Sequence, residues 1–292
     1  MTWKNVILDF VWKVLQRILP DKLYLSLKYR VVFKKKLNWK NPKTFNEKLQ
    51  WLKLYGFRDD YVKMADKVLV KDYVASKIGP EYIIPTLGVW KTAEDIDFAS
   101  VELPFILKCN HDSGTVIACK RQDFDADAIR RKMQKALQSD YYLMGREKPY
   151  KYIGRRIMAE KFISTPDGTG EIQDFKFFCF GGEPRIFKIN FDRSTDFKAN
   201  YYDTDMALLP FGEVWPAPDY SRTFEHPEGF DKMLEICRTL SEGIPFVRVD
   251  LYNVAGKIYF GELTFYPTSG FGPFTDPAWD EKLGSWIKLP SK

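Results

Sequence analysis

Histidine and cysteine are scarce and widely spaced in this sequence. Its 292 residues include two histidines, His111 and His226, and four cysteines that form no CxxC pair. A His-rich metal site is therefore excluded, and a Ser-His-Asp triad would depend on one of those two histidines. Well-separated cysteines do not indicate a disulfide framework or a zinc cluster, so a reducing compartment is the simpler interpretation.

Long hydrophobic runs, internal repeats and low-complexity tracts are also missing. No segment reaches the roughly 18 to 20 apolar residues needed to span a bilayer, and the N-terminus lacks the apolar stretch and cleavage site of a secretory signal. Hydrophobic residues make up 45% of the chain, with 23 Phe, 16 Tyr and 8 Trp, which is enough for a large core. We therefore expect a globular, cytoplasmic protein of one large or two ordinary domains.

Negative charge is scarce in the first 40 residues, which contain ten Lys or Arg residues and only two Asp. The whole chain has just six more basic than acidic residues, so the remainder is slightly acidic. Apolar residues recur at intervals of three and four over residues 3–19 and stop at Pro20, which predicts an amphipathic helix. Lys4, Lys13 and Arg17 lie off its apolar stripe.

Two interpretations of this segment remain open. In one, the helix packs on the body of the protein and its basic face is simply solvated. In the other, residues 1–40 lie on an anionic membrane surface, helped by the basic run Lys34, Lys35 and Lys36. The second interpretation would place a cytoplasmic protein at the inner face of the membrane. No groove-reading motif accompanies the charge, so we expect no nucleic-acid partner.

Residues 1–100 are expected to be mainly helical. Thr44 is followed three residues later by Glu47, a capping box that opens a helix with several apolar side chains to bury. A second helix is predicted over about residues 59–77, ending at Gly79. The pattern does not indicate a parallel βαβ domain in this part of the chain.

Further along, the pattern changes to short strands separated by turns. A strand over residues 104–109 delivers Lys108 near its end, and a turn over 110–115 leads into a second apolar strand at 116–118. Such a turn can aim several backbone N–H groups at one anion, with Gly114 removing side-chain bulk. A plain hairpin is the alternative, and the segment is not a Walker A loop.

A second hairpin is predicted over residues 247–264. Because strand side chains alternate, Arg248 and Asp250 share a face of its first strand. Glu262 and Thr264 share a face of the second strand for the same reason. If the register matches, two carboxylates and an arginine meet, and carboxylate and phosphate oxygens are the ligands that Mg²⁺ prefers. A cross-strand ion pair at the surface is the alternative.

The order of these elements resembles the ATP-grasp superfamily: a lysine followed by a glycine loop, a glutamate hinge, an Arg-x-Asp motif and a Glu-x-Thr motif. More narrowly, the sequence resembles the TupA-like branch, which is named for teichuronopeptide synthesis and occurs with genes for bacterial surface polysaccharides. The similarity extends over about residues 38–290. The motifs that carry it are NPKTFNEKL at 41–49, ADK at 65–67, ILKCNHDSG at 106–114, DFKFFCFGG at 174–182 and RVD at 248–250.

The resemblance implies an α+β ATP-grasp fold, in which two α+β subdomains clasp ATP, preceded by a helical N-terminal region. We expect a basic helical region over residues 1–58 and a helical or loop lead-in over 59–100. A subdomain with the phosphate loop and the adenine hinge would follow over 101–165, and a subdomain with the metal site over 166–292. The implied cofactors are ATP and Mg²⁺.

The resemblance also implies which residues bind the nucleotide. Lys108 would contact the α- and β-phosphates, the loop over 111–115 would cover the β- and γ-phosphates, and Glu160 would lie at the purine edge. The full set is Lys67, Lys71, Lys108, His111, Asp112, Ser113, Gly114, Thr115, Met158, Ala159, Glu160, Lys161 and Phe162.

Metal-binding and catalytic residues follow from the same resemblance. The predicted metal ligands are Asp250, Glu262 and Thr264, and the predicted catalytic residues are Arg248, Lys108, Ser269 and Gly270. The threonine stands where the superfamily usually has an asparagine. The arginine and the lysine would stabilise charge on the transferring phosphoryl group. The last two catalytic residues would donate backbone N–H groups to an acyl-phosphate oxygen.

ATP-grasp ligases typically make an acyl phosphate that an amine then attacks, so the resemblance implies an ATP-dependent carboxylate–amine ligase. The expected carboxylate is a sugar acid in a bacterial surface polysaccharide or its precursor, and the expected amine is an amino acid or a simple amine. Candidates to face this uronate-containing acceptor are Asp174, Lys176, Lys188 and Arg193. Solvent-facing strand charges are the alternative for each of them.

Two other functions remain open. A glycosyltransferase in polysaccharide biosynthesis would also use an acidic pair with a metal. The formal Asp-x-Asp match at residues 203–205, however, is more typical of a polar turn. A kinase that phosphorylates a sugar hydroxyl would use the same ATP site as a ligase. Nucleotide preference separates the first function from a ligase, and the fate of the phosphate separates the second.

Overall fold

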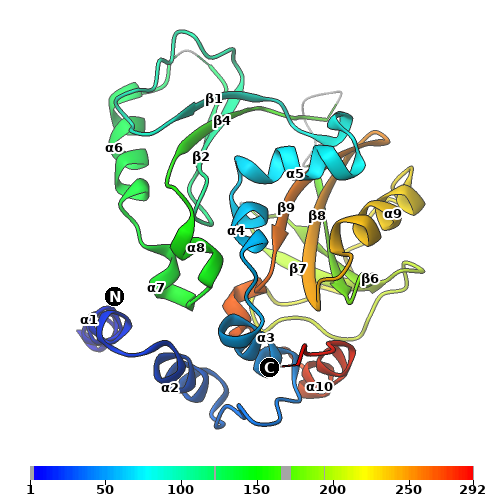
Figure 1. Ribbon diagram of the computed structural model, residues 1–292. Helices are drawn as coiled ribbons and strands as arrows, with labels where there is room; N and C mark the ends of the chain where they lie inside the picture. The colour runs from blue at the N-terminus through cyan, green and yellow to red at the C-terminus, as the bar shows by residue number, and fades with distance from the viewer. Residues whose placement is uncertain (1–2, 122, 166–171, 194, 292) are drawn as a thin grey trace.

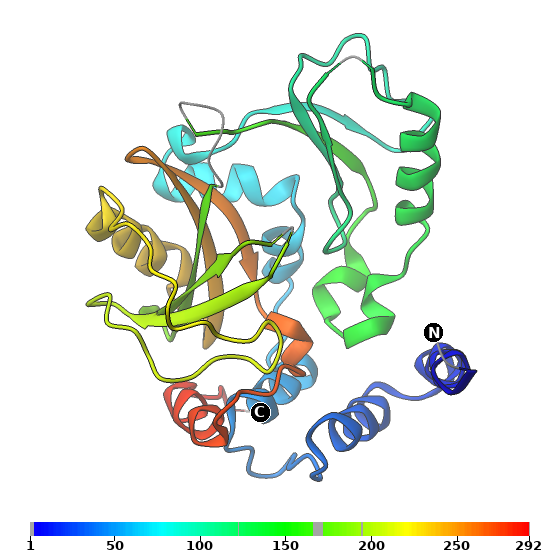
Figure 2. The ribbon, with the colours of Figure 1, turned by 180° about the vertical axis from the view of Figure 1, so that it is seen from behind.

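The computed structural model describes residues 3–121, 123–165, 172–193 and 195–291. In this part of the chain, helices surround two antiparallel β-sheets (Figure 1 and Figure 2). The first sheet has the strand order β1 (Thr86–Trp90), β4 (Ile157–Lys161), β2 (Phe105–Cys109) and β3 (Val116–Cys119). The second has the order β7 (Lys198–Asp203), β6 (Glu183–Phe191), β5 (Gln173–Phe180), β8 (Phe246–Val254) and β9 (Lys257–Thr264).

Each sheet packs against a helix. α6 (Ala126–Leu137) lies on the outer side of the first sheet, away from the second (Figure 1), and buries Met133 with Phe105. α9 (Phe230–Ser241) lies on the second sheet, where the Phe230 ring contacts Phe177 of β5. These contacts give the two sheets separate hydrophobic cores.

The central strand β5 is buried on both faces. Phe175 and Phe177 contact Phe187 of β6 on the α9 side of the sheet. Phe178 contacts Phe45, which opens α3 (Phe45–Tyr55), on the other side. Both faces of this strand are therefore covered, although Asp174 and Lys176 alternate with its aromatic residues. α10 (Pro277–Trp286) packs against α3 beside it.

The prediction of one helix over residues 59–77 is wrong. The segment forms two helices, α4 (Asp60–Ala65) and α5 (Leu69–Ile78). Asp66 separates them: its backbone is extended, and its Oδ1 accepts the N–H groups at the start of α5 at 2.8 and 3.2 Å. Its Oδ2 pairs with Arg156 at 3.0 Å. A side chain that bonds the backbone in this way competes with continued helix.

The segment expected to be helical or loop also contains a strand. The short helix η1 (Pro80–Tyr82) leads into β1, which pairs antiparallel with β4. Residues 1–100 are therefore not helical throughout. Because β1 flanks β4 on one side and β2 flanks it on the other, the predicted hinge strand lies inside the first sheet.

Both predicted hairpins are confirmed. β2 and β3 flank the predicted phosphate loop and pair Lys108 with Val116. β8 and β9 pair Arg248 with Thr264 and Asp250 with Glu262, so the register brings the four charged or polar side chains together. The predicted capping box is also present at the start of α3.

Two N-terminal helices, α1 (Trp3–Ile18) and α2 (Asp21–Phe33), lie at one end of the molecule, away from both sheets (Figure 1 and Figure 2). α1 ends before Pro20, as predicted. It contacts α7 (Tyr141–Gly145), which is followed by α8 (Lys148–Tyr152). Among the described residues, no helix combines the length and apolarity needed to cross a bilayer.

Candidate active site

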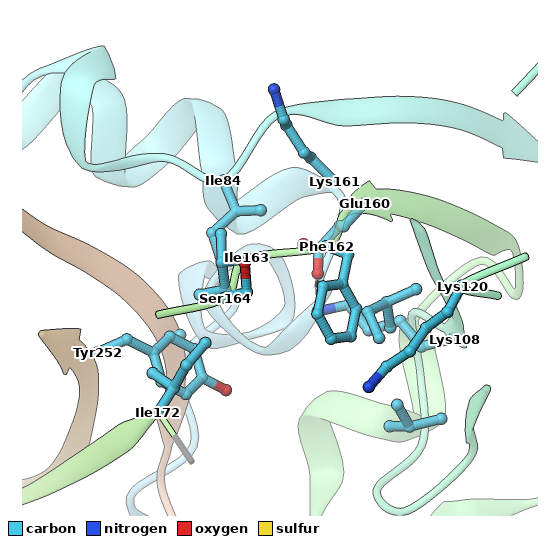
Figure 3. Close-up of a pocket in the computed structure, with 13 residues that line it drawn as sticks. Ile84, Lys108, Lys120, Glu160, Lys161, Phe162, Ile163, Ser164, Ile172 and Tyr252 are labelled. Carbon is cyan, nitrogen blue, oxygen red and sulfur yellow. Dashed lines mark ion pairs between the residues drawn. The ribbon is translucent and has the colours of Figure 1, made fainter. Parts of the chain in front are cut away.

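A cavity of about 440 Å³ lies between the two sheets (Figure 3). Strands of both sheets line it, together with the chain before β1 and after β4. A cavity of this size suits a small-molecule ligand. The lining residues are Ile84, Ile106, Lys108, Val116, Lys120, Glu160, Lys161, Phe162, Ile163, Ser164, Ile172, Tyr252 and Gly261.

Two lysines from different elements hold Glu160 at this cavity. Lys108 of β2 forms an ion pair with its Oε2, and the Nζ of Lys71, on α5, lies 2.7 Å from its Oε1. Burial acts to raise the pKa of Glu160, but the two lysines outweigh it and hold the pKa below its usual value. The three side chains together carry a net positive charge, which suits a phosphate group.

The predicted phosphate loop is anchored by its buried residues. The His111 side chain is buried, and its Nε2 lies 3.2 Å from the carbonyl oxygen of Ser139. Asp112 is also buried, and its carbonyl oxygen accepts a hydrogen bond from the Nζ of Lys67. Exposed or partly exposed at the tip are Ser113, Gly114 and Thr115. The glycine has φ of +102°, a conformation that favours glycine.

The predicted adenine hinge lies only partly in the cavity. Met158 and Ala159 are buried within β4, which pairs with strands on both sides. Lys161 and Phe162 line the cavity, and the Nζ of Lys120 lies 4.9 Å from the centre of the Phe162 ring (Figure 3). The side chain of Glu160 faces the two lysines described above. The part of the hinge that is open to a ligand therefore begins at the end of β4.

Sequence reasoning missed the wall that the second sheet contributes. Tyr252 continues the alternation that puts Arg248 and Asp250 on one face, and this pattern is the signal that could have found it. Gly261 is the extra residue of a β-bulge in β9. A Cβ atom at this position would lie 3.0 Å from the carbonyl oxygen of Asp250, so the close approach favours glycine.

A network of charged side chains lies on β5, β8 and β9. Arg248 donates from Nε to Oδ1 of Asp250 and from Nη2 to Oδ2, both at 2.6 Å. Its Nη2 also lies 2.9 Å from Oε1 of Glu262 and 3.1 Å from Oγ1 of Thr264. Lys176, opposite Asp250 on β5, lies 2.6 Å from Oδ2 of that carboxylate. The fold thus brings these predicted residues together.

Glu262 is the carboxylate of this network that opens toward solvent. Its side chain is 37% exposed, whereas that of Asp250 is 2% exposed. Burial acts to raise the pKa of Glu262, but Arg248, Lys67 and Lys176 hold it well below its usual value. Glu262 is therefore ionised at neutral pH, whereas both oxygens of Asp250 are already held by cations.

Comparison with protein families places this geometry in a known context. The model of the TupA-like ATPgrasp family matches residues 47–288, which is most of the chain. The protein belongs to the TupA-like ATP-grasp family. This match and the two-sheet arrangement confirm the predicted α+β ATP-grasp fold.

Comparison with solved structures found ligases of low similarity. D-alanine–D-alanine ligase from Bacillus anthracis matches with 16% identity and a TM-score of 0.39, over 84% of this chain and 69% of that chain. The ATP-grasp ligase PsnB, complexed with a minimal precursor, Mg and ADP, matches with 12% identity and a TM-score of 0.41, over 75% of this chain and 57% of that chain. Comparison with curated proteins found no match. The family assignment rests on the match over residues 47–288.

Mg²⁺, the metal implied by membership of the TupA-like family, would find two suitable donors in the network. Glu262 offers an ionised carboxylate and Thr264 a hydroxyl, and phosphate oxygens and water would complete an octahedral shell. Asp250 would join them only if Arg248, which contacts both of its oxygens, released one of them. In the described part of the chain, no group of three or more His, Cys, Asp or Glu side chains forms a ready metal site.

The four predicted acceptor residues differ in their surroundings. The Nζ of Lys176 lies between the carboxylates of Asp174, 2.5 Å away, and Asp250, 2.6 Å away. Arg193 lies 3.4 Å from Asp174 and is 56% exposed, so it is the member that can meet a substrate in solvent. Lys188 is buried against Glu213, 3.1 Å away, and is already neutralised.

The segment after β9 forms η2 (Pro267–Gly270), and buried polar side chains hold it in place. The N–H of Ser269 donates to the carbonyl of Tyr266 at 2.8 Å and is therefore already engaged, and its oxyanion contact stays a prediction. The Nζ of Lys53 donates to the Ser269 carbonyl at 2.7 Å, and the Ser269 hydroxyl donates to buried Glu147. Sequence reasoning missed Lys53 and Glu147, because no local pattern links them to this segment.

The formal Asp-x-Asp match is a polar turn, as its sequence indicates. Asp203 ends β7, and its Oδ1 accepts the N–H groups of Asp205 and Ala207 at 3.0 and 2.8 Å. The side chain is therefore used to close the turn. The charged network on β8 and β9 lies elsewhere in the sheet.

Proposed function

We propose that the protein is an ATP-dependent ligase that joins a carboxylate to an amine through an acyl phosphate. One observation carries the proposal: in a chain of the TupA-like ATP-grasp family, a cavity between the two sheets brings two lysines onto one carboxylate. Gly261 lines the same cavity, and its neighbour in the chain is Glu262. The proposal assigns nucleotide binding and phosphoryl transfer to adjacent parts of one site.

The nucleotide would occupy the cavity with its phosphates toward Lys108 and Lys71. Lys108 approaches from the first sheet and Lys71 from α5, and phosphates would compete with Glu160 for both lysines. Phe162 and Tyr252 offer ring surfaces on opposite walls for a flat base. Lys67 supports the loop that would cover the phosphates, because it holds the carbonyl of Asp112.

Phosphoryl transfer needs positioned charge more than covalent help from the protein. Arg248 and Lys108 would face the transferring group from the second and first sheets. Glu262 and Thr264 would hold Mg²⁺, which when bound neutralises charge on phosphate oxygens. The scarcity of histidine does not weaken such a mechanism.

The proposed carboxylate is a sugar acid in a bacterial surface polysaccharide or its precursor, and the proposed amine is an amino acid or a simple amine. The TupA-like branch is named for teichuronopeptide synthesis and occurs with genes for bacterial surface polysaccharides, which supports this choice of carboxylate. Arg193 supports it chemically, because an exposed guanidinium beside the charged network can pair with a uronate carboxylate. Such a substrate would place the enzyme in the cytoplasm.

Thermal unfolding with ligands tests the nucleotide site. We expect ATP or ADP with Mg²⁺ to raise the unfolding temperature of the wild type, and Lys108→Ala to abolish the shift. A ligand at a hundredfold excess over Kd stabilises by about 2.7 kcal/mol. A shift with UDP-sugars and none with adenine nucleotides would overturn the proposal in favour of glycosyl transfer.

Product analysis then tests the reaction. Uronic acids incubated with amino acids and ATP–Mg²⁺ should yield ADP, phosphate and an amide in equal amounts. Phosphate that remains on a sugar hydroxyl would instead indicate a kinase.

A further inference from the structure

The two N-terminal helices expose apolar side chains to solvent. On α1 and α2 these are Val11, Val14, Ile18, Leu23, Leu27 and Val31. Each is between 37% and 67% exposed, although side chains of these types are normally buried. Within each helix they recur at intervals of three or four residues, so they form one apolar stripe per helix. We call the two stripes together the N-terminal apolar face.

The opposite side of each helix is already packed. Tyr24 and Tyr29 of α2 are buried in a cluster that also contains Phe271. Trp12 of α1 and Leu19, directly after α1, pack against the same cluster. The helices therefore attach to the protein by one apolar side and retain a second. The sequence allowed the interpretation that the helix packs on the body of the protein. That packing accounts for the buried apolar side of the helices but not for the exposed one.

Polar contacts fix how the helices sit on the body. Arg146, buried directly after α7, donates from Nη2 to the carbonyl oxygens of Gln16 and Leu19 at the end of α1. It also pairs with Asp21 of α2 at 3.3 Å, and the hydroxyl of Tyr142 donates to the same carboxylate at 2.6 Å. The N-terminal apolar face is thus held in a defined orientation.

Positive charge accompanies this face. The exposed basic residues on the helices and directly after them are Arg17, Lys22, Arg30, Lys34, Lys35 and Lys36. Only two acidic residues occur before residue 41, and one of them, Asp21, turns toward Arg146. The rest of the chain is slightly acidic, so the positive field belongs to this end of the molecule.

We propose that α1 and α2 form a docking surface for an anionic lipid bilayer. The apolar stripes would enter the boundary between headgroups and acyl chains, while Lys and Arg side chains pair with lipid phosphates. A second copy of this chain fits the face less well, because it would bring two surfaces of the same sign together. The proposal does not depend on the ligase activity.

Docking would also set the position of η2 relative to the bilayer. Phe271 belongs to the cluster beneath α2 and directly follows η2, and the Nζ of Lys28 of α2 lies 4.7 Å from its ring centre. Only the side chains of this cluster therefore separate the docking surface from η2. A lipid-linked substrate would meet the protein on the side that faces the membrane.

Co-sedimentation of the full chain with vesicles tests the proposal, without nucleotide. We expect binding to vesicles of phosphatidylcholine with phosphatidylglycerol, and loss of most binding in high salt or with phosphatidylcholine alone. Leu23→Glu with Leu27→Glu should lower the bound fraction about tenfold or more, because carboxylates resist entry into the apolar boundary. The matched control is Leu208→Glu with Val214→Glu, a change at two exposed apolar residues elsewhere.

The same samples provide the controls for folding. Thermal unfolding and the shift with ADP–Mg²⁺ should be the same in both double variants and in the wild type. Absence of wild-type binding, equal binding to both kinds of vesicle, or equal loss in the control variant would each overturn the proposal. A dimer that only Leu23→Glu with Leu27→Glu dissociates, with no vesicle binding, would assign the face to a second copy. None of these outcomes would count against the ligase proposal.

Discussion

The guanidinium of Arg248 and the carboxylate of Asp250 form a two-pronged ion pair on one face of β8, with both N···O distances at 2.6 Å. The residues lie two positions apart in the strand, so their side chains point to the same side. Asp250 also lies 2.6 Å from Lys176, so one buried carboxylate contacts two cations. The integrity of the charged network therefore depends on this carboxylate.

Asp250→Asn should lower the free energy of unfolding by about 3 kcal/mol, because it removes the buried carboxylate that Arg248 and Lys176 share. The two cations would then pair only with Glu262 and Asp174. Urea unfolding of the ligand-free protein measures the change. Glu235→Gln is the control: it removes one partner of an exposed ion pair, Lys232–Glu235, and should change stability little. A loss no greater than that of the control would contradict the buried network.

Glu160→Gln should increase the stabilisation that ATP–Mg²⁺ provides. Lys108 and Lys71 would no longer be held by a competing carboxylate, so they would be free to meet phosphates. Without nucleotide the variant should be less stable by about 1 to 3 kcal/mol, because two partly buried lysines lose their partner. Thermal unfolding with and without the nucleotide measures both effects. A smaller ATP shift in the variant would instead support the predicted contact of Glu160 with the purine edge.

The same carboxylate should contribute to loss of stability in acid. Its folded-state pKa lies below the usual 4.5, so folding favours the ionised form of Glu160. This contribution is complete above the unfolded-state pKa and is lost as the pH falls through the lower folded-state value. Urea unfolding between about pH 5 and pH 3 should therefore give a shallower decline for Glu160→Gln than for the wild type. Parallel curves would show that the ion pairs contribute nothing.

Asp66 should stabilise the break between α4 and α5 in two separable ways. Asp66→Ala removes both the cap on α5 and the ion pair with Arg156, and should cost about 2 kcal/mol. Asp66→Asn keeps an oxygen for the cap and removes only the charge, so it should cost about half as much. Chemical unfolding of the two variants distinguishes the contributions. Equal costs would mean that the cap has no effect.

Much of the fold near the site could be predicted from short sequence patterns. Alternation placed Arg248 with Asp250 and Glu262 with Thr264, and the register of β8 and β9 confirms the pairing. The capping box at Thr44 is likewise confirmed. Each of these features is decided by interactions within a few residues or across one turn.

Other features could not be predicted in this way. The helix break at Asp66 depends partly on Arg156, which lies 90 positions further along the chain. β1 becomes a strand because β4 is available to pair with it. Neither partner is visible in the local pattern of residues 59–100, which therefore suggested helix or loop.

The sequence by itself determined the order of the motifs, the two hairpins, the helix caps and the positive charge of the N-terminal segment. Only the tertiary structure decided that Lys71 meets Glu160, that Tyr252 and Gly261 close the cavity, and that Glu147 lies beneath Ser269. The reason is physical: alternation and capping act over a few residues, whereas these partners meet because two sheets and their helices pack together. It was also packing that buried one apolar side of α1 and α2 and left the other side exposed.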